Sequence, residues 1–230
     1  MVHFTLFGIP VYIRPSFWVC WPFFGGALSI SSVEDLIYPA LFVIAGFVAI
    51  LSHEMGHALV GRKLGGGQQT IVLELFGGLT SSHGMQLTRG GRALMILAGP
   101  MMTLLLGIIS LGLTWNIVAP VMTSYNLNFW DLAISPFTAA LISPKLYILS
   151  CLIMIGEWWT ILNLLPIYPL DGGQLIAQYI RSPRKVFMTG FITAILIGLL
   201  SFQLFHGYFI PIFMALFAYS NYREYKNAPF

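Results

Sequence analysis

The sequence predicts an all-α polytopic membrane protein with about six transmembrane helices and a small membrane-associated β-hairpin element. Three observations predict this class. Charged residues make up 8% of the chain, whereas a soluble domain carries about 25%. Hydrophobic residues make up 57%, and they gather in uncharged runs long enough to cross a bilayer. The formal charge of +3 is small and dispersed, so nucleic acid is excluded as a partner.

The amino-terminal segment 4–14 is rich in aromatic and β-branched residues and is interrupted by Gly and Pro. It predicts two short strands around a turn at Gly8-Ile9-Pro10. The uncharged run 16–32 follows, which is short for a membrane span and also has the length of a signal-peptide core. We favour a retained first span.

Five further apolar runs complete the expected set of six spans, within a single domain that covers 1–230. A helix needs about 20 residues to cross the hydrocarbon core, so the first and last spans are short. The two cysteines, Cys20 and Cys151, lie in apolar runs and are expected to face lipid or the core as free thiols. The five further runs are 36–60, 93–122, 146–167, 186–205 and 208–222.

The basic residues give an orientation. Placing the amino terminus in the cytoplasm leaves Lys145 as the only basic residue outside, and the other ten of the 11 lie inside. This bias follows the positive-inside rule. The inside residues are Arg14, Arg62, Lys63, Arg89, Arg92, Arg181, Arg184, Lys185, Arg223 and Lys226.

A β-hairpin is expected in the cytoplasmic loop between the second and third spans, over residues 68–83. Ile71, Leu73 and Leu75 alternate with Thr70, Val72 and Glu74, and the connection Gly77-Gly78 is typical of a tight hairpin. Strand 70–76 would offer an exposed edge to which an extended peptide could add. The alternative is a simple interfacial loop.

The second span contains His53-Glu54-x-x-His57. On a helix, residues four apart lie on one face, so both imidazoles can reach one metal ion while Glu54 lies beside them. Ionisable residues inside a membrane span are costly unless they pair or bind something. The motif therefore predicts a metal site with His53 and His57 as ligands.

A catalytic zinc site needs one more protein ligand, and Glu157 and Asp171 are the candidates. Asp171 and His57 each come shortly before cytoplasmic basic residues, whereas Glu157 lies two to three turns deeper in its span. This difference in depth favours Asp171. Asp171 could also serve as the N-cap of the segment that follows, 172–181.

Taken together, His53-Glu54-x-x-His57, Asn163-x-x-Pro166 and Leu170-Asp171-Gly172 resemble the site-2 protease family of intramembrane zinc metalloproteases. Phe76-Gly77-Gly78 and Ala98-Gly99-Pro100 resemble further family features. One position departs from the family, because Thr103 stands where members often carry Asn. The resemblance is to a minimal bacterial member without PDZ or CBS domains, similar to the sporulation-type branch.

The resemblance implies hydrolysis of peptide bonds within or near transmembrane segments of membrane-protein substrates, in a bacterial inner membrane with the site toward the cytoplasm. One Zn²⁺ per chain would activate a water, with Glu54 as the general base. Asn163 would bind the substrate backbone or the developing oxyanion, and a helix–helix contact is an equal alternative. The hairpin residues expected to bind substrate are Val72, Leu73, Gly77 and Gly78.

Two other classes of function compete with a protease. A polytopic metal transporter would also place histidines and acids in the membrane, but the sequence contains no internal repeat. An inactive membrane scaffold has no need of Glu54, since a structural zinc site requires no general base. Membrane-protein substrates and the lipid bilayer are therefore the expected partners.

Overall fold

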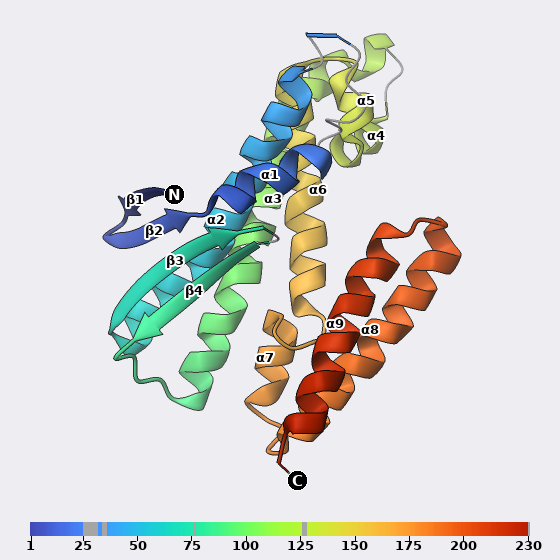
Figure 1. The fold of residues 1–230 in the computed structure, drawn as a ribbon. Coiled ribbons are helices and arrows are strands. Elements are labelled where there is room, and N and C mark those ends of the chain that lie inside the picture. Colours follow the sequence, from blue (N-terminus) through green and yellow to red (C-terminus); the bar gives the residue numbers. More distant parts are fainter. Residues whose placement is uncertain (25–31, 34–35, 76, 126–127, 230) are drawn as a thin grey trace. The chain divides into compact units, whose positions relative to one another are not determined.

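The computed structural model describes residues 1–230 except 25–31, 34–35, 76, 126–127 and 230 (Figure 1). The chain forms two compact units, Met1–Thr160 and Ile161–Phe230. The described part of the first unit holds a β-sheet and the helices from α1 to most of α6. The second unit holds the end of α6 and the helices α7, α8 and α9.

The sheet in the first unit has four strands in the order β1-β2-β3-β4. β1 and β2 form an antiparallel pair, as do β3 and β4, so the predicted hairpin is present. Its predicted connection at Gly77-Gly78 is wrong, because both glycines belong to β4, opposite Glu74 and Leu73. β2 and β3 pair in parallel, from Val11 opposite Ile71 to Ile13 opposite Leu73. The strands are β1 (Val2–Leu6), β2 (Ile9–Ile13), β3 (Gln68–Glu74) and β4 (Gly77–His83).

The prediction that strand 70–76 offers an exposed edge is wrong. Ile71, Val72 and Leu73 pair with β2 on one side and with β4 on the other, so their backbone groups are already used. Among the described residues β4 pairs only with β3, and β4 is therefore an edge strand of the sheet.

The turn between β1 and β2 lies one to two residues earlier than predicted. Phe7 and Gly8 have φ of 50° and 75°, the backbone region that a tight two-residue hairpin turn requires. Ile9 and Pro10, expected in the turn, belong to β2, where Pro10 lies opposite Thr5.

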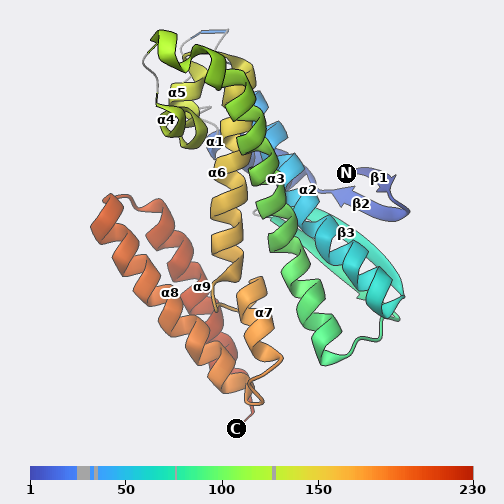
Figure 2. The same cartoon turned by 180° about the vertical axis from the view of Figure 1, so that it is seen from behind.

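Alternate residues of β2 and β3 build the core of the first unit. Ile71 and Leu73 are fully buried, and they belong to one cluster with Phe17 of α1 and Ile50 of α2. A strand places alternate side chains on one face, so these positions turn one side of the sheet toward the helices. α2 and α3 also pack closely, since a Cβ added at Gly56 would lie 2.8 Å from the carbonyl carbon of Ala98 (Figure 2). The helices of this unit are α1 (Pro15–Phe24), α2 (Ile37–Gly65), α3 (Arg89–Tyr125), α4 (Phe129–Ile134), α5 (Pro136–Ala140) and α6 (Pro144–Leu164), which continues into the second unit.

Four helices of the described chain are long and apolar enough to cross a membrane: Ile37–Gly65, Arg89–Ala119, Pro144–Leu164 and Pro183–Leu204. They correspond to the four inner spans predicted from the sequence. The first and last predicted spans are not among them. α1 ends at Phe24, and residues 25–31 of the expected span 16–32 lie outside the described residues. α9 carries Arg223, Glu224 and Lys226 in its last two turns, so its mean hydropathy is lower.

The second unit contains α7 (Asp171–Ala177), α8 (Pro183–Phe205) and α9 (Phe209–Asn227). α8 and α9 run side by side along most of their length (Figures 1 and 2). The start of α8 lies next to the end of α9, because Arg184 Nε donates to the carbonyl oxygen of Ala228 at 3.0 Å. The core of the unit comprises Ile167, Ala194, Met214 and Ala218.

Candidate active site

Two histidines and a glutamate lie on the inner face of α2. His53, Glu54 and His57 are 2%, 5% and 8% exposed. The segment is helical throughout, so the four-residue spacing brings the two imidazoles over one another, as the sequence predicts. Buried histidines and carboxylates need partners or a metal ion.

The geometry of the two imidazoles fits a metal ion. His53 Nε2 and His57 Nε2 lie 3.1 Å apart. Two nitrogens bound to one tetrahedral zinc at ~2.0–2.1 Å lie about 3.3 Å apart. His57 Nδ1 lies 2.8 Å from the carbonyl oxygen of Met95, which only accepts, so in the neutral ring this nitrogen carries the proton and Nε2 carries the lone pair. The first unit therefore presents two converging imidazole nitrogens as candidate metal ligands.

His53 lies against a small hydroxyl network. Its Nδ1 is 3.5 Å from Oγ1 of Thr103, at the outer limit of a hydrogen bond. Thr103 is fully buried, and its hydroxyl lies 3.1 Å from that of Thr160 and 3.0 Å from the carbonyl oxygen of Pro100. The residue noted as a departure from the family pattern thus contacts a candidate ligand.

Gly99 of α3 allows this helix to approach both imidazoles. A Cβ at this position would collide with His57 Nε2 and would lie 2.9 Å from His53 Nε2. The glycine in Ala98-Gly99-Pro100 is therefore required by the packing of α3 against the candidate ligands.

Glu54 is held by the edge strand β4. Thr80 Oγ1 donates to Glu54 Oε2 at 2.7 Å and lies 3.1 Å from the backbone oxygen of Glu54. Gly78 lies so close that a Cβ there would be 2.7 Å from Glu54 Oε1. The hairpin therefore covers the carboxylate and leaves room for it only because Gly78 has no side chain.

The second unit holds Asp171 and Asn163. Asp171 is the first residue of α7 and is 6% exposed, and the N-cap position belongs to Leu170, so the alternative role of Asp171 as an N-cap is wrong. Gly172 and Gly173 follow it, and a Cβ on either would collide with the backbone of Leu164, Leu165, Ile167 or Tyr168. Asn163 is buried in the last turn of α6.

Among the described residues, His53, His57 and Asp171 are buried and each offers one ligand atom of the kind that binds a metal ion. The competing acid, Glu157, is exposed on α6. Of the residues expected to bind substrate, Leu73 is fully buried in the core and Val72 is half-buried.

The sequence did not predict the contacts of Thr80 and of the Met95 carbonyl with the site. It identified Gly99 and Thr103 as motif positions but did not predict that they contact the two histidines. Thr80 and Met95 lie 26 and 38 residues from the side chains that they contact. The available signal was the position of Gly99, Thr103 and Thr80 beside motifs that were already recognised. Gly99 lies inside the third-span motif, Thr103 follows it, and Thr80 comes two residues after Gly78.

Comparisons with known proteins agree with these motifs. A family model described as Peptidase family M50 matches residues 41–205. A protein named as a zinc metalloprotease in Methanocaldococcus jannaschii is 28% identical over 227 residues, which are 94% of this chain and 57% of that protein. The chain thus spans little more than half the length of this relative. The solved structure of a site-2 protease from the same organism superposes with a TM-score of 0.59 and 23% identity, over 97% of this chain and 94% of that one.

Proposed function

The chain belongs to peptidase family M50, and on this premise we propose that it is an intramembrane zinc metalloprotease. It hydrolyses peptide bonds within or near the transmembrane segments of membrane-protein substrates. The observation that carries the proposal is the pair of imidazole nitrogens 3.1 Å apart, with His57 oriented by Met95 and with Glu54 on the same buried helix face.

His53, His57 and Asp171 would hold one Zn²⁺ per chain. Two imidazoles and one carboxylate are a usual protein set for a catalytic zinc that keeps one open position. The bound metal would lower the pKa of a water molecule and polarise the scissile carbonyl. Burial of all three side chains supports the assignment, since buried ionisable groups in proteins are paired or coordinate a metal ion.

Glu54 acts as the general base and then as the general acid. Its carboxylate takes a proton from water and later delivers it to the leaving amine. Thr80 holds one carboxylate oxygen through its hydroxyl, which leaves the second oxygen, Oε1, available for proton transfer. The backbone of β4 at Gly78 lies close to the other side of the same carboxylate.

A zinc analysis of purified variants tests the ligands. His53→Ala, His57→Ala and Asp171→Ala should each lose the metal, whereas Glu157→Ala should keep it, because Glu157 is exposed. Zinc retained by Asp171→Ala and lost from Glu157→Ala would show that the wrong acid was chosen.

Glu54→Gln separates an enzyme from a transporter or an inactive scaffold. The variant keeps the size of the side chain and the metal ligands, so zinc should stay while cleavage falls by a factor of roughly 10² or more. Membrane proteins that accumulate at full length in cells with this variant are the candidate substrates. Unchanged cleavage of these proteins would refute the general-base role.

Substrate capture is assigned to β4 in place of the inner strand β3. An extended segment added to β4 would lie beside Glu54, because Gly78 and Thr80 of this strand both contact that side chain. Gly77 and Gly78 permit a close backbone approach. Asn163 is kept as a second substrate contact on the basis of the family motif.

Photo-crosslinking in the Glu54→Gln protein tests this assignment. A crosslinker at Leu79, which is 59% exposed on β4, should capture a substrate. The matched control is Val2, which is 55% exposed on β1 at the opposite edge of the sheet. Crosslinking at Val2 but not at Leu79 would place substrate capture elsewhere.

The proposed topology has six spans in a bacterial inner membrane, with the site toward the cytoplasm. The contact between Arg184 and Ala228 supports a sixth span, because it holds the start of α8 and the end of α9 on one side of the membrane. A helix that crosses in α8 must then return in α9. Basic residues at both of these ends favour the cytoplasmic side.

A further inference from the structure

The turn that precedes Asp171 is a compact element of the second unit. Ile167 donates its backbone N–H to the oxygen of Leu165 at 2.7 Å, and Leu170 donates to the oxygen of Ile167 at 2.8 Å. Gln174 of α7 returns to this turn, because its side-chain Nε2 donates to the oxygen of Pro169 at 2.9 Å. The direction in which α7 begins is therefore tied to the conformation of residues 167–170.

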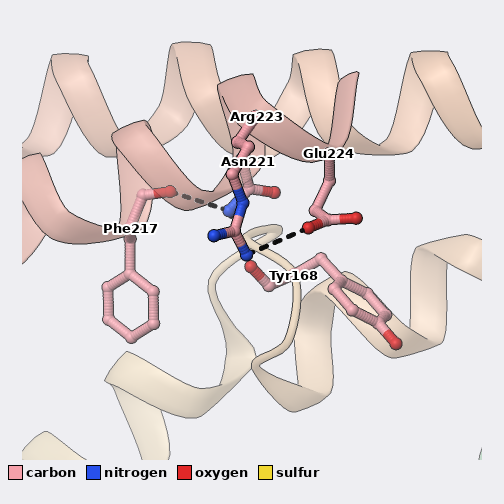
Figure 3. A network of polar contacts seen from close by, with 5 residues as sticks. All are labelled: Tyr168, Phe217, Asn221, Arg223 and Glu224. Atoms are coloured by element: carbon pink, nitrogen blue, oxygen red, sulfur yellow. Dashed lines mark hydrogen bonds and ion pairs between the residues drawn. The ribbon is translucent and has the colours of Figure 1, made fainter. Parts of the chain in front are cut away.

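Asn221 of α9 holds this turn from outside. Its amide nitrogen donates to the carbonyl oxygen of Tyr168 at 2.6 Å. It also donates to that of Phe217 at 2.9 Å (Figure 3). An amide nitrogen has two donors, so both are used. The orientation of the amide follows, since a flipped group would place its oxygen against two carbonyl oxygens. Asn221 is 1% exposed and connects a helix to the turn 53 residues earlier.

Gly190 of α8 makes room for this side chain. A Cβ at Gly190 would collide with Asn221 Oδ1, and it would lie 2.8 Å from Asn221 Cγ and 3.3 Å from Ile167 Cα. Within the described residues Oδ1 has no hydrogen-bond partner. The amide therefore makes its hydrogen bonds only through its nitrogen, and one of the two goes to the turn.

The turn is in direct contact with the residues that follow Asp171. Gly173 lies against the peptide between Ile167 and Tyr168, where a Cβ would collide with the Ile167 carbonyl carbon and the Tyr168 nitrogen. Asn221 therefore holds the peptide between Tyr168 and Pro169. The preceding peptide, between Ile167 and Tyr168, packs on the first turn of α7. A shift of this turn would move Asp171.

We propose that Asn221 is a positioning residue for Asp171: it fixes the Tyr168 carbonyl, and through the turn 167–170 it sets where the Asp171 carboxylate lies. The inference rests on the proposed role of Asp171 as a metal ligand. Asn221 is buried and follows Ala218 by three residues on α9, and a Cβ at Gly190 would meet both Asn221 and Ile167; Ile167 and Ala218 belong to the apolar core of the unit. An apolar side chain could fill this volume, whereas only a donor can hold the turn.

The test compares Asn221→Leu and Asn221→Asp with matched changes at Asn227, an exposed residue on the same helix. Leu removes both donors, and Asp turns an oxygen toward two carbonyl oxygens. Gly190→Ala is a third variant, which leaves Asn221 unsubstituted but displaces its side chain. The detergent-purified full chain is loaded with zinc, and the release of zinc to a chelator is followed. Substitution of a residue that orients a metal ligand weakens metal binding by roughly 10- to 100-fold.

We expect the three variants to release zinc at least ~10-fold faster than the wild-type chain, while Asn227→Leu and Asn227→Asp release it at the wild-type rate. The visible spectrum of the Co²⁺-loaded protein should also change, because it reports the arrangement of the ligands. Thermal unfolding of the metal-free protein distinguishes this from a loss of fold. A lower unfolding temperature with wild-type zinc release and an unchanged Co²⁺ spectrum would show that Asn221 only stabilises the helix pair.

Asp171→Ala separates the two proposals. If that variant keeps its zinc, the assignment of Asp171 as a ligand fails, and the role of Asn221 fails with it. If Asp171→Ala loses zinc while the Asn221 and Gly190 variants release it normally, only the positioning role is refuted. Fast zinc release from Gly190→Ala at an unchanged unfolding temperature supports the positioning role, and this variant does so without substituting Asn221 itself.

Discussion

Gly99→Ala should abolish zinc binding, although it adds one methyl group. A Cβ added at position 99 would lie 2.2 Å from His57 Nε2 and 2.9 Å from His53 Nε2. The first distance is about 0.8 Å shorter than the 3.0 Å that real Cβ atoms keep from their neighbours. The imidazole of His57 or the backbone of α3 must therefore move by about that amount. A zinc–ligand distance tolerates only about ±0.2 Å. The required shift is several times larger, so the two nitrogens can no longer converge on one ion.

The assay is the zinc content of the purified protein together with its thermal unfolding. Gly112→Ala is the matched control on the same helix, because a Cβ there meets no atom within 4 Å. That control should keep its zinc and gain up to about 1 kcal/mol of stability, since Ala favours a helix over Gly. A Gly99→Ala protein with stoichiometric zinc would refute the packing argument for the site.

Three further predictions concern the base and the topology. Thr80→Val should lower kcat roughly tenfold or more at unchanged zinc content, because Glu54 loses a charge-assisted hydrogen bond, and Thr80→Ser should restore it; equal rates for both variants would remove the role of the hydroxyl. Gly78→Ala should reduce cleavage and leave zinc bound, since its Cβ would lie 2.7 Å from Glu54 Oε1; zinc loss would contradict this separation of base from ligands. Cysteines at Gly66 and Ser182 should react only from the cytoplasmic side, and labelling of either from outside would invert the topology.

Local patterns in the sequence predict the parts of the fold that depend on neighbouring residues. The spacing of His53 and His57 predicts a shared helix face, and the alternation over 70–76 predicts a strand of the hairpin, although Gly77 and Gly78 lie in β4 and not in its turn. The four long inner helices follow from hydropathy alone. Each of these features is set within a few residues along the chain.

Contacts between distant residues could not be predicted in this way. The parallel pairing of β2 with β3 joins segments about 60 residues apart, and it turns the expected edge strand into an inner one. Alternation identifies the buried face of a strand but not the strands beside it. The same limit applies to Thr80 beside Glu54, since a hydroxyl in a strand has no sequence pattern that marks a distant partner.

The pairing of β2 with β3 also constrains the number of membrane crossings between them to an even number. Both strands belong to one sheet, so Ile13 and Ile71 stand on the same side of the membrane. If α2 crosses the membrane once, as its length and composition allow, only an even number of crossings returns the chain to the side on which it started. The proposed six-span topology meets this condition, because it counts the segment 16–32 as a span before α2. The sheet therefore gives a reason, separate from hydropathy, to propose a crossing in this short segment.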